Sequence, residues 1–242
     1  MTHSPLISIT QLPANLLPES AVAVVATPEM WRNPVYPQEE SLITNAVQKR
    51  QAEFRAGRHS ARLALAQLDV HNFPLLKDTR RAPIWPKAIV GSITHCERFC
   101  CTIVTANPNI AAIGIDAEAI TPLPLETVSL ICSESELKQL HTQGLTQDFW
   151  SKVIFSIKES FYKCYSPLTL SFLDFLEAHV TIKKNQIKNT ALNKTQQGEF
   201  EIDLLTPSHE KLYNRSKFFG HFTIIEKTVI CTTVVYPPLY KR

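Results

Sequence analysis

The sequence predicts an α+β fold, and the order of helix-like and strand-like segments carries this prediction. Residues 39–68 and 148–165 each show apolar side chains at a 3.6-residue period between charged ones, which indicates two long amphipathic helices. A Val-rich run at 21–27 and an apolar run at 110–116 indicate strands. From about residue 170 onward strand-like runs dominate, so helices and strands are mixed along the chain.

A similarity between two segments of the chain suggests how these elements are organised. Residues 91–98 and 220–227 share a Gly, a Thr, a Glu and a basic residue at the same positions, and a β-branched run follows each. Hairpins are common, so chance similarity between two hairpins is one interpretation. The other is a duplicated α+β unit, which would place the active site between two halves.

The remaining elements follow from local signals. Residues 91–106 fit a hairpin that turns at Glu97-Arg98, and the Pro-rich stretch 74–86 fits a loop with a basic cluster. Ser133 with Glu136 predicts a capping box at a helix start. We expect the second long helix to stop before Pro167.

Composition excludes several classes of function. Of the 242 residues 44% are hydrophobic, which supports a packed core, and the net charge of +3 is too small for a nucleic-acid footprint. The six cysteines lack zinc-site spacing, and neither a signal peptide nor an apolar run long enough for a membrane span is expected. These features favour a cytoplasmic protein with free thiols.

The segment around Asp116 and Glu118 is the first candidate site. Side chains alternate along a strand, so these two carboxylates point to the same side, and Gly114 before them permits a close approach by another backbone or a ligand. Two such acids fit either a solvated strand end or a site for a hard cation. The pair by itself does not decide between the two.

The second candidate lies on the helix at 148–165. Glu159 and Lys163 are four residues apart and share a helix face, with Lys158 adjacent. A surface ion pair is the simple interpretation. The many apolar neighbours favour a cleft instead, in which the set would meet metal and phosphate.

Further candidates could bind phosphate. Thr94 and His95 lie in the first hairpin, where the imidazole can donate to a phosphate or exchange a proton, although a single His is commonly structural. Guanidinium forks suit phosphate oxygens, and Arg50 and Arg58 lie eight residues apart on one helix. The basic set comprises Arg50, Arg55, Arg58, Arg80 and Arg81. No Gly-rich phosphate loop, H-E-x-x-H or G-x-S-x-G motif is present.

Five short motifs occur in a fixed order. They are R-x-x-E-F-x-A-G-R (50–58), R-x-P-x-W-P (81–86), G-S-I-T-H (91–95), G-I-D-A-E (114–118) and F-S-I-K-E-S-x-x-K (155–163). Together they resemble the larger phosphopantetheinyl transferases of the surfactin and enterobactin-synthase type. Phe155 stands where surfactin-type members usually carry Trp, and Cys96 where Ser is frequent.

The resemblance implies a fold and a reaction. The fold is a pseudo-dimer of two similar α+β halves, each a small, mostly antiparallel sheet packed with a long helix, divided here as residues 1–120 and 121–242. The reaction moves the 4′-phosphopantetheine arm of coenzyme A onto a serine of an apo peptidyl, aryl or acyl carrier protein. Our expected carrier belongs to a siderophore (enterobactin-like) nonribosomal peptide synthetase. We expect a monomer, free or within a synthetase complex.

The resemblance also assigns residues. Asp116, Glu118 and Glu159 would hold Mg²⁺, with Glu159 also a candidate base for the serine. The residues expected at the phosphates of coenzyme A are Arg50, Arg58, Arg81, Thr94, His95, Lys158 and Lys163. Two alternatives stay open, namely another magnesium-dependent phosphoryl or nucleotidyl transferase and a non-catalytic module that binds coenzyme A.

Overall fold

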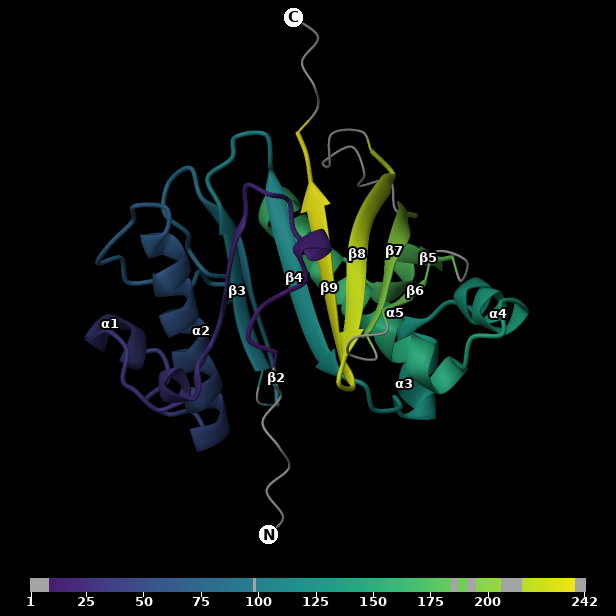
Figure 1. Ribbon diagram of the computed structural model, residues 1–242, viewed down its shortest axis with the longest axis horizontal. Coiled ribbons are helices and arrows are strands. Elements are labelled where there is room, and N and C mark those ends of the chain that lie inside the picture. The colour runs from purple at the N-terminus through teal and green to yellow at the C-terminus, as the bar shows by residue number, and fades with distance from the viewer. Residues whose placement is uncertain (1–8, 98, 184–186, 191–194, 206–214, 238–242) are drawn as a thin grey trace, which may run out of the picture.

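The computed structural model describes residues 9–97, 99–183, 187–190, 195–205 and 215–237. It contains two antiparallel sheets, one of three strands in the order β1-β3-β2 and one of six. In the larger sheet the path is β4-β9-β8-β7-β5, and β6 pairs with β7. The smaller sheet and its helix lie on the left of Figure 1 and the larger sheet on the right, where β4 is the strand of the larger sheet nearest the smaller one.

The N-terminal half packs one long helix on the three-stranded sheet. Its central elements are β1 (Val22–Val25), α2 (Gln48–Ala66), β2 (Val90–Cys96) and β3 (Phe99–Thr105). Three short helical segments complete it: η1 (Ala14–Leu16), η2 (Pro28–Trp31) and α1 (Pro37–Glu40). Every residue of β3 is buried, because α2 covers one face of this central strand and residues of β4 and β9 cover the other.

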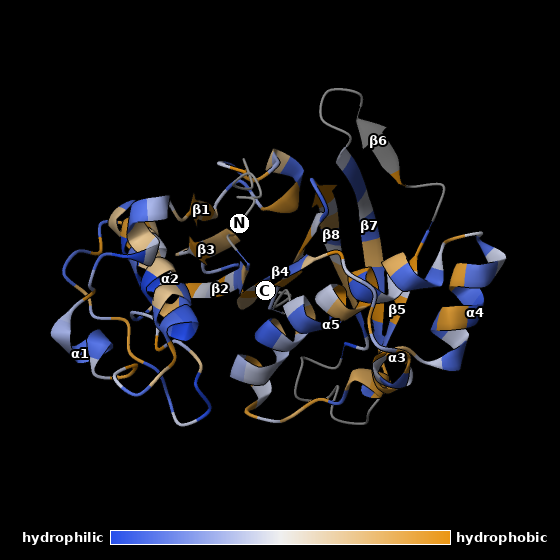
Figure 2. Cartoon of the chain, turned by 90° about the horizontal axis from the view of Figure 1, so that it is seen from below, coloured by the Kyte–Doolittle hydropathy of each residue, from blue (hydrophilic) through white to orange (hydrophobic). Residues whose placement is uncertain are grey.

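The C-terminal half repeats this plan on a larger scale. Its central elements are β4 (Ala112–Ala119), α5 (Gln147–Thr169), β8 (Lys217–Ile225) and β9 (Thr228–Val235). The other elements are α3 (Leu125–Ile131), α4 (Glu134–Thr142), η3 (Phe175–Glu177), β5 (Ala178–Ile182), β6 (Lys188–Thr190) and β7 (Thr195–Leu204). Strands β5, β6 and β7 have no counterpart in the N-terminal sheet. In Figure 2 helices α2 and α5 lie along different parts of the molecule, each beside the strands of its own half.

The two halves share one topology. The unit β1-α2-β2-β3 has the strand order β1-β3-β2, and the unit β4-α5-β8-β9 has the equivalent order β4-β9-β8. Both hairpins close through two-residue turns, and Glu97, Glu226 and Lys227 there adopt positive φ angles of 39°, 50° and 73°. Positive φ matches the twist of the flanking strands. The predicted α+β fold of two similar halves is therefore confirmed, whereas Arg98 lies outside the described residues.

The first long helix is shorter than predicted. Residues 41–47 form turns, so the predicted helix at 39–68 divides into α1 and α2. The hydroxyl of Ser41 donates to the carbonyl of Gln38, and that of Thr44 donates to the carbonyls of Glu40 and Ser41. Such local bonds compete with continuous helix, so the 3.6-residue apolar period alone overestimated its length.

The second long helix is longer than predicted. It continues past Pro167 to Thr169 and ends at Leu170, which adopts the left-handed conformation with φ 57°. The amide of Leu170 still donates to the carbonyl of Ser166. Because Pro167 lies in the last turn, the helix loses one hydrogen bond near its end rather than in its interior, which makes the proline tolerable.

Two glycines allow close packing between helices and strands. A Cβ at Gly114 would lie 2.0 Å from the carbonyl oxygen of Ser160, so this glycine lets α5 lie directly on β4. A Cβ at Gly57 would lie 3.1 Å from Ile93 of β2, and α2 continues through Gly57 without a break. The close partner of Gly114 is thus a backbone, one of the two possibilities its sequence left open.

The sheets divide the chain earlier than the predicted boundary at residue 120. Strand β4 pairs with β9 from Ala112↔Val235 to Ala119↔Thr228, so by hydrogen bonding it belongs to the C-terminal half. The division into 1–120 and 121–242 stays a prediction. Across the described residues, no helix has the length and apolar character that crossing a membrane requires.

Candidate active site

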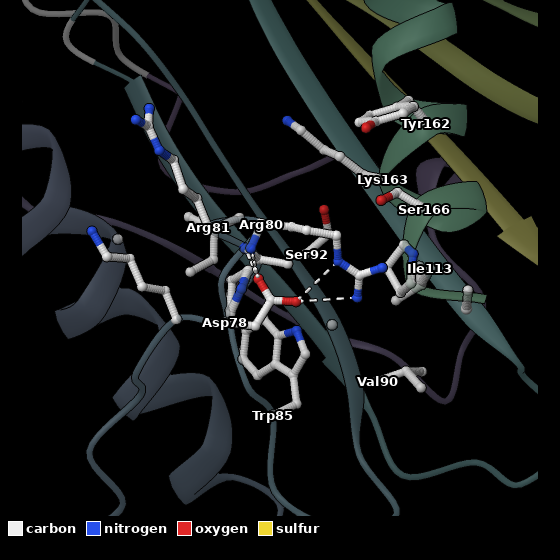
Figure 3. Close-up of a pocket in the computed structure, with 18 of the residues that line it drawn as sticks. Asp78, Arg80, Arg81, Trp85, Val90, Ser92, Ile113, Tyr162, Lys163 and Ser166 are labelled. Atoms are coloured by element: carbon white, nitrogen blue, oxygen red, sulfur yellow. Dashed lines mark hydrogen bonds and ion pairs between the residues drawn. The ribbon is translucent and has the colours of Figure 1, made fainter. Parts of the chain in front are cut away.

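A cavity of about 990 Å³ opens between the two halves. The N-terminal half contributes one face of α2, part of β2 and the loop that carries Asp78, Arg80 and Trp85. The C-terminal half contributes part of α5 and the start of β4. Figure 3 shows the loop side chains on one side and Tyr162, Lys163 and Ser166 of α5 on the other. Residues from distant parts of the sequence therefore meet in one space.

The halves join where β2 runs beside β4. The hydroxyl of Ser92 accepts a hydrogen bond from the amide of Ile115 at 3.2 Å, and that of Thr94 accepts one from the amide of Ala117 at 2.8 Å. Side-chain hydroxyls thus satisfy the backbone donors on this edge of β4. Thr94 also donates weakly to Asp116, at 3.5 Å. The hydroxyl of Thr94 thus joins the two halves, and its contact with a phosphate of coenzyme A stays a prediction.

Asp116 is the centre of the polar network and is only 5% exposed. Its carboxylate accepts a hydrogen bond from Ser156 at 2.9 Å and from Lys163 at 2.8 Å. Lys163 also donates to the carbonyl of Ile115 at 2.9 Å, so it holds both the side chain and the backbone of β4. Asp116 and Lys163 therefore lie in direct contact, and the roles that the resemblance assigns to them stay predictions.

Glu118 points toward α5 as Asp116 does, as strand alternation predicts. Its carboxylate pairs with Lys152 at 3.3 Å. Burial, followed by the negative charge of Asp116, raises the pKa of Glu118 above its usual value, and Lys152 opposes this shift. Burial and the charge of Asp116 also raise the pKa of Glu159. These three carboxylates therefore repel one another in a partly dry environment.

This arrangement fits a hard cation by the chemistry of its donors. Oxygen ligands suit Mg²⁺, and a cation would offset the mutual repulsion that raises the pKa values of Glu118 and Glu159. Within the described part of the chain, no group of three His, Cys, Asp or Glu side chains is already gathered around one point. Mg²⁺ commonly uses one or two carboxylates and completes its shell with water and phosphate oxygens. The three-residue metal set stays a prediction.

His95 lies beside the cavity in a network with α2. Arg50 donates to its Nε2 at 2.8 Å, and its Nδ1 is 3.7 Å from the carboxylate of Glu53. Because Arg50 can only donate, Nε2 accepts and carries no proton. Burial lowers the pKa of His95, and the negative charge of Glu53 only partly opposes this effect. Arg50 and His95 were predicted together as phosphate-binding residues, and they line the same cavity.

Arg58 is the most deeply buried guanidinium of this wall, at 6% exposure. It lies 4.2 Å from the centre of the Phe54 ring, and its Nε atom has no hydrogen-bond partner among the described residues. Burial lowers the pKa of Arg58 to about 10, and nearby Glu39 opposes that shift. A buried donor without a partner is costly, which favours an anionic ligand at this place.

The loop side of the cavity carries Arg80 and Arg81. Arg80 pairs with Asp78 at 3.1 Å, whereas Arg81, with a φ angle of 68°, lines the cavity. The carboxylate of Asp78 also accepts from the amides of Arg80 and Ala82, at 2.9 and 2.8 Å. The turn is therefore fixed by Asp78, a residue that sequence reasoning did not single out.

The structure does not bring Lys158 to the cavity with the other predicted phosphate-binding residues. Its side chain is buried on the side of α5 away from the 990 Å³ cavity and donates to the carbonyls of Ile131 and Phe175 and to the carboxylate of Glu136. These bonds are 2.8, 2.8 and 2.9 Å long, so all three N–H donors are used within the fold. Lys158 therefore has no donor left for a pyrophosphate.

We expect Lys158→Met to destabilise the protein strongly. Removal of one partner leaves the carboxylate of Glu136 buried without its cation, which typically costs about 3–5 kcal/mol. The measurement is the free energy of unfolding in urea. In Lys158→Met/Glu136→Gln the uncompensated charge is gone, so this double variant should recover part of the loss; equal or greater instability would contradict the pairing.

Sequence reasoning missed several residues of the site. Lys152 and Ser156 lie on the same helical face as Glu159 and Lys163, at spacings of four, three and four. That periodicity was the available signal, since residues at such spacings share a face. Trp85 and Tyr162 line the cavity as well. Trp85 is the Trp of the R-x-P-x-W-P motif, whereas Tyr162 falls on an unspecified position of its motif and had no comparable signal.

Comparison with known proteins agrees with this arrangement. Residues 38–105 match the family described as 4′-phosphopantetheinyl transferase N-terminal domain, and residues 112–223 match the 4′-phosphopantetheinyl transferase superfamily. The two matches meet between β3 and β4, where the sheets also divide.

Individual relatives cover most of the chain. The 4′-phosphopantetheinyl transferase Npt of Nocardia iowensis is 39% identical over 175 residues, which is 71% of this chain and 75% of the relative. PptT of Mycobacterium tuberculosis is 34% identical over 183 residues, 73% of this chain and 79% of the relative. Enterobactin synthase component D of Escherichia coli is 32% identical over 136 residues, 55% of this chain and 64% of the relative. The chain belongs to the 4′-phosphopantetheinyl transferase superfamily and is an enzyme of that kind.

Proposed function

We propose that this enzyme transfers the 4′-phosphopantetheine arm of coenzyme A to a serine of a carrier protein, with Mg²⁺ at Asp116, Glu118 and Glu159. The observation that carries the proposal is the cavity between the halves, where cationic side chains face an acidic one. Arg50, Arg58, Arg81 and Lys163 line it together with Glu159. Cationic forks suit the phosphates of coenzyme A, and a carboxylate suits the proton of an attacking hydroxyl.

The reaction is phosphoryl transfer, so the protein mainly positions groups and neutralises charge. The serine oxygen forms a bond to the phosphorus that carries pantetheine, the pyrophosphate P–O bond breaks, and adenosine 3′,5′-bisphosphate leaves. Bound Mg²⁺ would polarise the pyrophosphate oxygens. Lys163, 2.8 Å from Asp116 and exposed to the cavity, is placed to meet charge developing on the leaving phosphate.

Glu159 is our candidate for the group that takes the serine proton. Burial and the neighbouring charge of Asp116 raise the pKa of Glu159, which makes its carboxylate a stronger base than an ordinary one. It also faces the cavity beside Tyr162 and Lys163. In this scheme the proton moves from the serine hydroxyl to a Glu159 oxygen as the new bond forms.

For the carrier we propose a siderophore nonribosomal peptide synthetase, a proposal supported by the similarity to enterobactin synthase component D. We further propose that the enzyme is a cytoplasmic monomer that meets its carrier transiently or within the synthetase complex. Two similar halves in one chain already enclose the cavity, so a second copy is not needed to complete it.

Intact-protein mass spectrometry tests this function. We expect the enzyme, with coenzyme A and Mg²⁺, to add one phosphopantetheine mass to an apo carrier with its serine, and to leave a Ser→Ala carrier unchanged. Aryl and peptidyl carriers of siderophore synthetases should be modified about tenfold more efficiently than fatty-acid carriers. No added mass on any of the three carrier classes would refute the transfer, and equal rates would refute the siderophore assignment alone.

A further inference from the structure

One buried carboxylate outside the cavity connects three parts of the N-terminal half. Glu39, at 1% exposure, accepts hydrogen bonds from the amide of Tyr36 at 3.1 Å and from the amide of Leu75 at 2.8 Å. It also accepts from the guanidinium of Arg62 on α2 at 2.7 Å. Glu39 therefore ties the start of α1, the middle of α2 and the chain at Leu75 to a single point.

Leu75 begins the segment that forms the loop side of the cavity. We call residues 75–85 the basic arm. Within it, the amide of Asp78 donates to Ala82 at 2.9 Å and that of Ile84 donates to Leu76 at 3.0 Å. The arm is thus held together internally like a short hairpin. Its residues that line the cavity are Lys77, Asp78, Arg80, Arg81, Ala82, Pro83 and Trp85, some of them visible in Figure 3.

The internal bonds fix the shape of the basic arm but not its place on the molecule. Its base is attached by the hydrogen bond from the buried amide of Leu75 to Glu39. Glu39 is also close enough to Arg58 for its negative charge to raise the pKa of that guanidinium. One carboxylate therefore contacts the base of the arm and stabilises the charge of Arg58, which also lines the cavity.

The C-terminal half contains an equivalent buried glutamate. Glu136, fully buried, accepts from the amides of Ser133 and Val180 at 2.7 Å each and from Lys158 of α5 at 2.9 Å. Both glutamates occupy the third position of a short helix in a capping box, and both pair with a cation of the long helix. The two glutamates differ in the distant amide that each accepts from. Glu39 accepts from Leu75 at the base of the basic arm, whereas Glu136 accepts from Val180 in β5.

We propose that Glu39 is a positioning residue for phosphate binding, because it fixes the basic arm relative to Arg58 in the lining of the cavity. This inference rests on the proposed function, in which the cavity takes the phosphates of coenzyme A. Oriented binding groups lose much of their effect when they move by about 1 Å. Trp85 at the far end of the arm packs against the core cluster that includes Leu65 and Val104, so loss of the Leu75 bond would free the base of the arm rather than the whole of it. Arg81 would then shift relative to Arg58, and the two would no longer meet the same ligand together.

The test combines binding with amide exchange. The probe is adenosine 3′,5′-bisphosphate, which carries the phosphates without the pantetheine arm, and its affinity is measured by calorimetry. In Glu39→Leu all three donors lose their acceptor, so we expect about tenfold weaker binding and rapid hydrogen exchange at the Leu75 amide. Glu39→Gln keeps an amide oxygen for Leu75, so protection and affinity should return to within about threefold of the original values.

Glu136→Gln is the matched control, since it removes the charge of the equivalent buried glutamate in the C-terminal half. It should lower the melting temperature while leaving the affinity for the bisphosphate within about twofold. A purely structural role for Glu39 would likewise move only the melting temperature. If Glu39→Leu does not fold, Glu39→Gln still decides: free exchange at Leu75 with unchanged affinity overturns the proposal.

The outcomes separate this proposal from the one it rests on. No binding of the bisphosphate to the unsubstituted protein contradicts the proposed function and this inference with it. Normal binding that is unaffected in Glu39→Leu, with the Leu75 amide exchanging freely, contradicts the positioning role alone. Weaker binding in Glu39→Leu that is restored in Glu39→Gln supports it.

Discussion

Replacement of Asp116 by Asn should reduce kcat/KM for carrier modification by about 10³-fold. This is the upper end of the loss that enzymes typically show when one group that stabilises transition-state charge is removed. The amide has the shape of the carboxylate, so packing around this 5% exposed side chain is kept. The negative charge that pairs with Lys163 at 2.8 Å is removed, together with a proposed ligand of the metal. Activity is measured by the rate of carrier mass gain, and folding by the melting temperature.

Ser156→Ala is the matched control for this prediction. It removes the 2.9 Å hydrogen bond to Asp116 but keeps the carboxylate and its pair with Lys163. We expect a loss of no more than about tenfold, the scale of one hydrogen bond. Asp116→Ala, which removes the oxygen ligands altogether, should abolish turnover. If Asp116→Asn retains activity within tenfold of the original enzyme, the metal-binding role is wrong.

The second large effect is expected for Lys163→Met, which should lower kcat by about 10²–10³-fold. Lys163 is the cation of α5 that reaches both Asp116 and the cavity. Its loss removes the positive charge placed to meet the leaving phosphate, whereas Ser156 still holds Asp116. Single-turnover kinetics at saturating coenzyme A measures the chemical step separately from binding.

Lys152→Met provides the comparison that isolates the position of the charge. Lys152 also lies on α5 and also pairs with a carboxylate of β4, Glu118, at 3.3 Å, yet it does not line the cavity. Both substitutions remove one charge and one ion pair of α5 with β4. Lys163 also donates to the carbonyl of Ile115 and Lys152 also lies over the Phe155 ring, so each loses one further contact, and the main difference is that only Lys163 lines the cavity. Lys152→Met should therefore cost at least about tenfold less in kcat. Similar losses in both variants would contradict the assignment of Lys163 to the leaving phosphate.

Local sequence patterns predicted the fold class and nominated several of the residues that line the cavity. The alternation of Asp116 and Glu118 on a strand and the spacing of Glu159 and Lys163 on a helix are local geometry, so the direction of each pair could be predicted. The repeat of Gly, Thr and Glu in two hairpins is also a local signal, because a tight turn restricts which residues can occupy it. It indicated two similar halves.

Only the tertiary structure decided what lies next to each of these residues. Lys158 and Glu159 are neighbours in sequence, but successive residues of a helix point about 100° apart, and the sequence does not say which direction meets the cavity. Packing turned Lys158 to buried Glu136 and left Glu159 facing the cavity. Likewise, Glu39 and Leu75 are 36 residues apart and meet only because α1 and the basic arm pack together. Contacts between segments distant in sequence depend on the folded packing, which local patterns do not specify.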